Sequence, residues 1–295
     1  MLITGAGTGL GKETALYLAR QGHDVWACVL SDAQEETLRE AAAERGLDLR
    51  VEQMDVTRDE SVHAVVDRMR QDGGGIYGLV NNAGIALRGY FEDLDDQEIR
   101  DVFDVNVFGA MRVTRAVLPA MREARRGRII MVTSIGGRIG SLAVSAYSSS
   151  KFALEGFGES LYQEVKPLGI HVSLVAPAIV KTERFGANRG YARNAFREDG
   201  PYQAWFTESQ RLTDRLVESS KTSPADVARV IHKALTAKKP RLRYTVGGRA
   251  RLILSLRKHL PGELFERLYF GEAMRRVTRG GTATDAGRSD STHKT

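Results

Sequence analysis

The sequence predicts an α/β protein: one domain with a doubly wound parallel sheet, helices on both of its faces and a C-terminal helical extension. Over the first three-quarters of the chain, short apolar runs alternate with longer helical patterns, as in consecutive βαβ units. The apolar runs do not alternate with polar residues, so we expect helices to cover both faces of the strands. Neither an internal repeat nor an interdomain linker interrupts the pattern, and the predicted domain therefore extends over residues 1–279.

The individual elements follow from the apolar periodicity and from the residues that interrupt it. Seven apolar runs are the predicted strands: Leu2–Thr4, Asp24–Val29, Leu49–Met54, Tyr77–Asn81, Gly127–Thr133, Ile170–Val175 and Arg243–Val246. The predicted helices lie near residues 10–21, 33–45, 59–71, 95–123, 147–166 and 224–237. Gly22 and Gly46 are placed as C-caps, and Ser223 as the N-cap ahead of an N1 proline, Pro224. The first strand has only three residues where ~5–6 are usual, so we expect an upstream start or a truncated chain.

Residues 183–222 depart from this rhythm and are predicted to form a lid. The segment contains six aromatic residues: Phe185, Tyr191, Phe196, Tyr202, Trp205 and Phe206. Such rings can cover an apolar pocket, which would suit a bulky hydrophobic alcohol or ketone. They can equally serve only to pack the lid against the body of the domain, and the sequence leaves both interpretations open.

The C-terminal part is basic and is predicted to end in disorder. Residues 249–276 favour two helices separated by Pro261, in which leucines alternate with arginines and lysines. Such a helix can lie on an anionic membrane surface, although packing of its apolar face on the domain is the favoured interpretation. Residues 280–295 are rich in Gly, Ser, Thr and Asp, which is typical of a disordered tail.

Charge and composition exclude several classes of protein. The net charge of +6 is concentrated in residues 238–279, which hold twelve Lys or Arg and three Asp or Glu, so we expect no nucleic-acid ligand for the domain as a whole. Cys28 is the only cysteine and lies in an apolar run, which excludes an intramolecular disulfide and a cysteine-based metal site. Without a run of ~20 apolar residues or a secretory signal, the sequence predicts a cytoplasmic protein.

A glycine-rich turn between the first strand and the first helix predicts a dinucleotide site. Gly5, Gly9 and Gly11 would allow phosphates to approach backbone N–H groups at the positive end of a helix dipole. Asp55, at the end of the third strand, could accept from an adenine amino group, and small residues at 81–84 would let the ligand lie across the strand ends. The alternatives are an ordinary tight loop and a helix-capping role for Asp55.

Three further residues predict a proton-transfer site without a metal. Tyr147 and Lys151 are four residues apart, which puts them on one face of a helix. An isolated tyrosine has a pKa near ~10 and is a poor base at neutral pH, but a fixed cation beside it favours the phenolate. Ser134 adds a hydroxyl that can hydrogen-bond a carbonyl or alcohol oxygen. The alternative is a solvated helix face.

Taken together, these motifs resemble the short-chain dehydrogenase/reductase family. The matches are Thr4-Gly5-x-x-x-Gly9-x-Gly11, Asp55-Val56, Asn81-Asn82-Ala83-Gly84, Asn106, Ser134, Tyr147-x-x-x-Lys151, and Pro177 with Thr182. The C-terminal features Ser223-Pro224 and Arg243-Tyr-x-Val-Gly247 look like the retinol and hydroxysteroid dehydrogenase branch. Ala178 departs from the family, which usually has glycine after the proline. The resemblance implies a Rossmann fold and a homodimer or homotetramer.

The resemblance also implies roles for these residues. Tyr147 would be the general acid/base, Lys151 would support it and hold the nicotinamide ribose, Ser134 would polarise the substrate oxygen, and Asn106 would hold a water. Residues implied to contact the dinucleotide are Gly5, Thr8, Gly9, Leu10, Gly11, Asp55, Val56, Asn82, Ala83, Gly84, Tyr147, Lys151, Ile179 and Thr182. The expected activity is NAD(P)-dependent interconversion of a secondary or bulky hydrophobic alcohol and its carbonyl. Alternatives are a non-catalytic dinucleotide-binding regulator and a non-redox dehydratase or epimerase.

The choice between NAD and NADP should be made at the end of the second strand. A carboxylate there would accept from the ribose 2′-OH, whereas a cation would bind the 2′-phosphate. Val29 and Leu30 are apolar and Thr8 is uncharged, while Asp32 can either read the ribose or start the next helix. The sequence therefore favours NAD only weakly.

Overall fold

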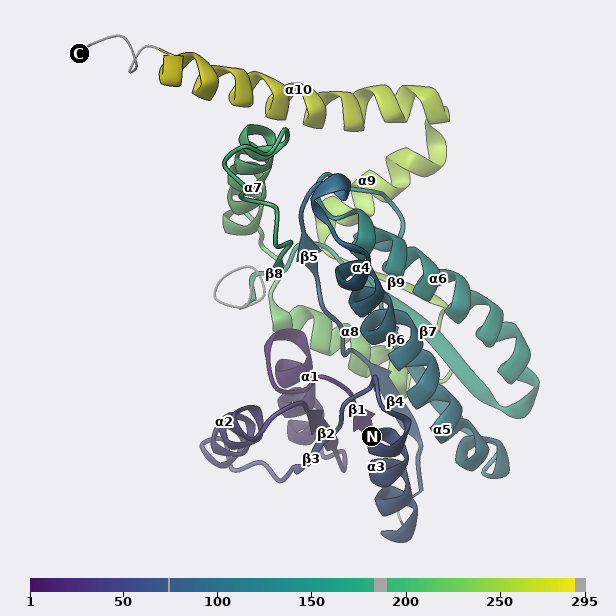
Figure 1. Ribbon diagram of the computed structural model, residues 1–295. Coiled ribbons are helices and arrows are strands. Elements are labelled where there is room, and N and C mark those ends of the chain that lie inside the picture. The colour runs from purple at the N-terminus through teal and green to yellow at the C-terminus, as the bar shows by residue number, and fades with distance from the viewer. Residues whose placement is uncertain (74, 183–189, 290–295) are drawn as a thin grey trace.

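The computed structural model describes residues 1–73, 75–182 and 190–289, with side chains described as far as residue 278. Its centre is a seven-stranded parallel sheet (Figure 1). The order across the sheet is β3 (Arg50–Gln53), β2 (Trp26–Val29), β1 (Leu2–Ile3), β4 (Gly78–Asn81), β6 (Gly127–Val132), β7 (Ile170–Pro177) and β9 (Arg243–Val246). All seven predicted strands are therefore confirmed. The order reverses between β1 and β4, which is where open α/β sheets bind ligands.

Two helical layers enclose the sheet, as the apolar strands predict. One layer contains α1 (Gly9–Arg20), α2 (Asp32–Ala43) and α8 (Pro224–Thr236). The other contains α3 (Asp59–Gln71), α5 (Ala110–Glu123) and α6 (Ser145–Val165). Successive strand residues enter different layers: Leu2 packs in the second and Ile3 in the first, and both are fully buried. This alternation explains why both faces of each strand are apolar.

Local signals at helix ends agree with the sequence. Gly22 and Gly46 adopt φ values of +79° and +60°, the left-handed conformation expected of C-cap glycines. Ser223 caps α8 and forms a capping box with Asp226.

Cys28 is fully buried on β2, and burial raises the pKa of its thiol, so the side chain stays protonated and unreactive.

The single helix predicted over residues 95–123 is wrong in one respect. It consists of α4 (Asp96–Phe103) and α5, joined by a π-helical turn, η2 (Asp104–Gly109). The apolar pattern continues across the junction and gives no sign of it. The turn contains Asn106, whose buried amide bonds the backbone of Ile85, and this tertiary contact accounts for the local change of winding.

The predicted lid contains a helix and a short strand. β8 (Gly190–Tyr191) pairs with β5 (Leu87–Arg88), and α7 (Gln203–Glu218) follows. Phe206 is fully buried in a cluster of aromatic rings, and the Tyr202 ring stacks on Tyr90 at 4.9 Å between centroids. Phe185 lies outside the described residues. Tyr202 and Phe206 thus pack the lid against Tyr90 of the body, as the second interpretation predicts, whereas Phe196 and Trp205 are partly exposed.

Two helices complete the chain: α9 (Gly248–His259) and α10 (Gly262–Ser289), separated at Pro261 as predicted. In Figure 1, α10 runs across the end of α7, with which it is in contact. Leu252 and Leu256 of α9 are exposed, whereas Ala250 is buried. The backbone of α10 continues to Ser289, across part of the segment for which the sequence predicts disorder. No described helix is long and apolar enough to cross a membrane.

The remaining elements are short. They are the 3₁₀ turns η1 (Phe91–Asp93), η3 (Ile135–Gly137) and η4 (Lys166–Leu168). Of these, η3 directly follows Ser134 and contacts α6, so it connects two parts of the site described below.

Candidate active site

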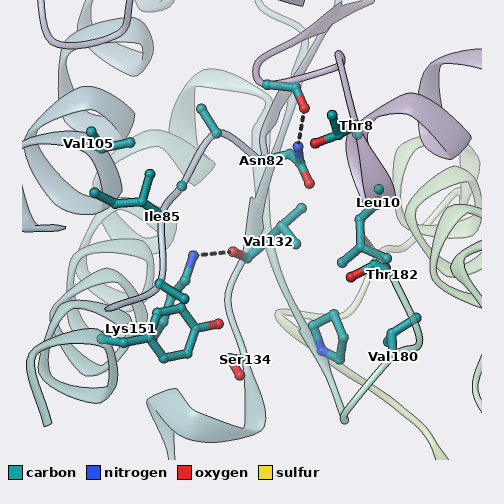
Figure 2. Close-up of a pocket in the computed structure, with 18 of the residues that line it drawn as sticks. Thr8, Leu10, Asn82, Ile85, Val105, Val132, Ser134, Lys151, Val180 and Thr182 are labelled. Atoms are coloured by element: carbon teal, nitrogen blue, oxygen red, sulfur yellow. Dashed lines mark hydrogen bonds between the residues drawn. The ribbon is translucent and has the colours of Figure 1, made fainter. Parts of the chain in front are cut away.

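A cavity of about 410 Å³ lies at the carboxyl ends of the central strands. Ser134 and every residue predicted to contact a dinucleotide line it; Asn106, which lies behind the wall, does not. In Figure 2, Thr8, Leu10 and Thr182 lie on one side of the cavity, and Lys151 and Ser134 lie on the other. The fold therefore brings the predicted residues together, while their roles remain predictions.

The glycine turn sits tightly against the end of β4. Gly5 has φ +63°, and a Cβ on it would lie 2.8 Å from Ala83 Cα. A Cβ on Gly11 would lie 2.1 Å from the carbonyl oxygen of Gly5. Neither position can accept a side chain without a shift of backbone, so both glycines are required for the close approach of the turn to the strand.

The start of α1 suits an anionic group. The helix begins at Gly9 on the cavity wall, its N-cap Thr8 makes no side-chain hydrogen bond to it, and its first turn has no acidic residue. The positive end of the helix dipole is therefore turned to the cavity without a carboxylate that would neutralise it. This arrangement fits a pyrophosphate at the position the sequence predicts.

Thr4 and Asn82 fix the two strand ends to each other. The hydroxyl of Thr4 accepts hydrogen bonds from the backbone N–H groups of Asn82 and Ala83, each at 3.0 Å. The Asn82 amide donates in return to the carbonyl oxygens of Thr4 and Gly5, each at 3.0 Å. These four bonds hold the turn after β1 and the loop after β4 as one rigid wall of the cavity.

Asp55 closes a turn of its own rather than capping α3. Its Oδ1 accepts from the Thr57 backbone N–H at 2.9 Å and from the Thr57 hydroxyl at 2.7 Å, and the N-cap of α3 is Arg58. Its other oxygen takes no hydrogen bond from a described residue. The helix-capping alternative for Asp55 is therefore wrong, and an adenine contact stays a prediction.

Tyr147, Lys151 and Ser134 meet at one end of the cavity. Lys151 is 4% exposed, and its ammonium donates to the carbonyl oxygen of Val132 at 3.1 Å and lies 5.8 Å from the centroid of the Tyr147 ring. The Ser134 hydroxyl accepts from the Gly136 N–H at 3.0 Å. A Cβ on Gly136 would lie 3.4 Å from Ser134 Oγ and 3.5 Å from Tyr147 Cε1, so the two side chains flank that glycine. The alternative of a solvated helix face is wrong for Lys151.

Asn106 is fully buried behind this group. Its Oδ1 accepts from the Ile85 N–H at 2.7 Å, and its Nδ2 donates to the Ile85 carbonyl and to the Ser150 hydroxyl, both at 2.9 Å. It holds the loop after β4 in place, and Gly84 is small enough to let Asn106 and Lys151 approach it. A water-holding role remains a prediction.

The end of β2, where the sequence predicts the choice between NAD and NADP, lies on the cavity wall, whereas Asp32 lies away from it. Asp32 does not line the cavity, because its carboxylate bonds Gln53 in the first turn of α2. The predicted positions Val29 and Leu30 line it together with Gln34, and Gln34 Oε1 accepts from the Leu30 N–H at 3.0 Å. Gln34 could not be predicted from the sequence, because it is one of several polar residues in a helix turn.

Two further polar residues of the cavity lining were not predicted from the sequence. Arg88 of β5 and Thr213 of α7 line the cavity, and Arg88 Nη2 donates to the Thr213 hydroxyl at 2.7 Å. They are 125 positions apart in the sequence, and nothing local to either predicts the contact. None of the described aromatics in the lid lines the cavity: Tyr191 and Phe206 pack in the aromatic cluster, and Phe196 and Trp205 are partly exposed.

Comparisons with known proteins agree with this geometry. The model of the short chain dehydrogenase family matches residues 1–190. The chain is 37% identical to retinol dehydrogenase 8 of Bos taurus over 275 residues, covering 90% of this chain and 88% of that protein. It is 31% identical to the mitochondrial D-beta-hydroxybutyrate dehydrogenase of Bos taurus over 286 residues, covering 91% and 83%.

Solved structures show the same similarity. A short-chain dehydrogenase from Streptomyces avermitilis superposes with a TM-score of 0.76 at 34% identity, covering 93% of this chain and 97% of that one. A short chain dehydrogenase/reductase from Burkholderia phymatum, solved in complex with NAD, gives a TM-score of 0.72 at 25% identity, covering 82% and 87%. The chain belongs to the short-chain dehydrogenase/reductase family, and with it to the oxidoreductases that use a nicotinamide dinucleotide.

Proposed function

We propose that this protein interconverts a secondary or bulky hydrophobic alcohol, of retinoid or steroid type, and its carbonyl compound. The observation that carries the proposal is the grouping of Ser134, Tyr147 and Lys151 at one end of a cavity whose other end is the glycine turn. The retinol dehydrogenase named above is similar over nine-tenths of the chain, which supports the class of alcohol.

Each residue of the group then has a defined task. The bound nicotinamide would supply or accept the hydride, which is chemistry that the protein only positions. Tyr147 takes the alcohol proton during oxidation and returns it during reduction. Ser134 donates to the substrate oxygen and orients it. Lys151, held by the Val132 carbonyl, keeps a positive charge beside the phenol, and Asn106 keeps the neighbouring loop in place.

A small hydroxy acid is the second candidate, because Arg88 puts a cation into the lining of the same cavity. A guanidinium recognises a carboxylate through paired hydrogen bonds. The similarity to D-beta-hydroxybutyrate dehydrogenase points in the same direction. The two candidate substrates need different contacts with the cavity wall: the bulky alcohol needs apolar contacts, and the hydroxy acid needs an ion pair.

An absorbance assay at the reduced-nicotinamide band decides between them. The purified protein is incubated with NAD or NADP and with retinol, a hydroxysteroid, a simple secondary alcohol or 3-hydroxybutyrate. We expect turnover with a bulky apolar alcohol. Turnover with 3-hydroxybutyrate alone would favour the hydroxy acid. Tight dinucleotide binding without any turnover would favour a regulatory protein, and product formed without net cofactor consumption would favour a dehydratase or epimerase.

We further propose a preference for NAD. The cavity wall after β2 is formed by Val29, Leu30 and Gln34, and this part of the described lining has no lysine or arginine for a 2′-phosphate. Leu30→Arg is expected to shift the NADP-to-NAD ratio of kcat/KM towards NADP by ~10-fold or more, the scale of one charge-assisted hydrogen bond.

Asp32→Arg is the matched control for this change, because Asp32 bonds Gln53 outside the cavity. The two ratios are measured under identical salt conditions. A larger shift in the Asp32 variant than in the Leu30 variant would contradict the assignment of Leu30.

We also propose that the protein is a homodimer or homotetramer. Phe108 of η2 and Phe152 of α6 are 54% and 42% exposed, and the two elements are in contact, so these rings offer an apolar face for a second copy. Light scattering of the purified protein gives the mass, and a monomer at micromolar concentration would contradict this proposal.

A further inference from the structure

We infer that Glu155 is a positioning residue that holds Ser134 in register with Tyr147 and Lys151. The inference rests on the proposed function, because it concerns how the reacting group is assembled. Glu155 lies on α6, one helical turn beyond Lys151, and is 6% exposed. Neither the sequence motifs nor the cavity lining includes it.

The carboxylate of Glu155 contacts both ends of the segment that carries Ser134, residues 133–138, here called the Ser134 segment. On one side of Ser134, the Thr133 hydroxyl donates to Glu155 Oε1 at 2.7 Å. Its other possible acceptor, the carbonyl oxygen of Val175, is farther away, at 3.2 Å. On the other side, Arg138 Nε lies 3.3 Å from the same oxygen. One side chain of α6 thus holds the segment by a hydrogen bond before Ser134 and by an ion pair after it, in which Arg138 Nε makes no hydrogen bond.

Successive turns of α6 therefore hold successive residues of the strand that leads to Ser134. Lys151 Nζ donates to the carbonyl oxygen of Val132, and Glu155 accepts from Thr133. The packing between the two segments is close, since a Cβ on Gly137 would lie 2.7 Å from the Lys151 carbonyl oxygen. The helix that carries the tyrosine and the lysine thereby also sets the position of the serine.

A third contact fixes the other oxygen of the carboxylate. Arg243 of β9 places its Nε 3.4 Å from Glu155 Oε2, and its Nη2 lies 2.8 Å from Glu159 Oε2. Two guanidinium groups and two carboxylates are thus held together, which satisfies the buried charge of Glu155. With both oxygens in use, the side chain has little freedom, and rigid support of this kind is what a reacting group requires.

Loss of this support should lower kcat rather than weaken dinucleotide binding. In Glu155→Gln the side chain keeps its size but loses the charge that binds both arginines. We expect kcat to fall by ~10-fold or more, the scale of a small misplacement of a reacting group. The dissociation constant of the dinucleotide, measured by fluorescence titration, should change by less than about twofold, because Glu155 does not line the cavity.

A double-mutant cycle with Ser134→Ala tests whether Glu155 acts through the serine. If it does, Glu155→Gln should lower kcat by less than about twofold in the S134A background, because the group it positions is already absent. Losses that multiply, with the same factor in both backgrounds, would overturn the inference and leave the proposed function intact. Glu159→Gln is the matched control on the same helix: it contacts Arg243 but not the Ser134 segment, and its kcat should stay within about twofold of wild type.

Two further measurements keep the test decisive. If Glu155→Gln does not fold, Thr133→Val removes one of the ties without a change in charge and should show the same dependence on Ser134. If the wild-type protein turns over no substrate, the proposed function fails, and hydrogen exchange still tests the placement of Ser134. The Gly136 amide, which donates to Ser134 Oγ, should exchange faster in Thr133→Val than in wild type, and equal rates would overturn the inference.

Discussion

Replacement of Tyr147 by phenylalanine is expected to lower kcat by ~10²-fold or more, the usual contribution of a positioned acid or base. The change removes one oxygen and keeps the ring, so packing beside Lys151 and Gly136 is preserved. The dinucleotide should still bind, because the glycine turn and the Thr4–Asn82 bonds are unaffected. A fall in kcat with a nearly constant dissociation constant for the dinucleotide is the expected result.

Tyr162→Phe provides the matched control for this variant. Tyr162 lies on the same helix, packs in the core on the far side of the sheet from α1, and its ring contacts Lys166. The same atom is therefore removed from the same element, away from the cavity. Pre-steady-state mixing separates the chemical step from product release. A kcat of Tyr147→Phe near that of the wild type would contradict the role of Tyr147 as the general acid/base.

The sequence predicts the sheet and the cavity well for a physical reason. In a parallel sheet enclosed by helices, a strand must be apolar on both faces, and its carboxyl end must carry whatever the ligand contacts. Asp55 and Asn82 follow apolar runs directly, so their meeting at one sheet edge follows from the strand pattern alone. Ser134 and Tyr147 are close for the same reason, since they stand at the end of β6 and at the start of α6.

Other features depend on contacts between distant segments and could not be predicted. The π-helical turn at Asn106 is set by Ile85, which belongs to a separate loop. The direction of the Asp32 carboxylate is set by Gln53 on the neighbouring strand. The aromatic residues of the lid are equally apolar in either role, and only their tertiary partners show that they pack against each other. The periodicity of apolar residues indicates which face of a helix or strand is buried, but not which residues cover that face.

Gly11→Ala is the variant with the largest expected effect on stability. The added Cβ would lie 2.1 Å from the Gly5 carbonyl oxygen and 2.5 Å from the Asn82 amide nitrogen. The first of these is backbone, so the contact cannot be relieved by a side-chain rotation. The turn and the strand end must move apart, which breaks the bonds that Asn82 donates to Thr4 and Gly5. Overpacking of this kind costs about 1–3 kcal/mol or more of the free energy of unfolding.

Dinucleotide affinity should fall together with stability, because the same movement shifts the start of α1 on the cavity wall. Gly156→Ala is the control: it adds the same atom within helix α6, where nothing lies within 4 Å of the new Cβ. That change should be neutral or stabilising by up to about 1 kcal/mol, because alanine favours a helix. Thermal unfolding with and without dinucleotide measures both quantities. If Gly11→Ala unfolds at the wild-type temperature and binds the dinucleotide with wild-type affinity, the turn relaxes around the new Cβ, and the close approach of the turn to the strand does not require this glycine.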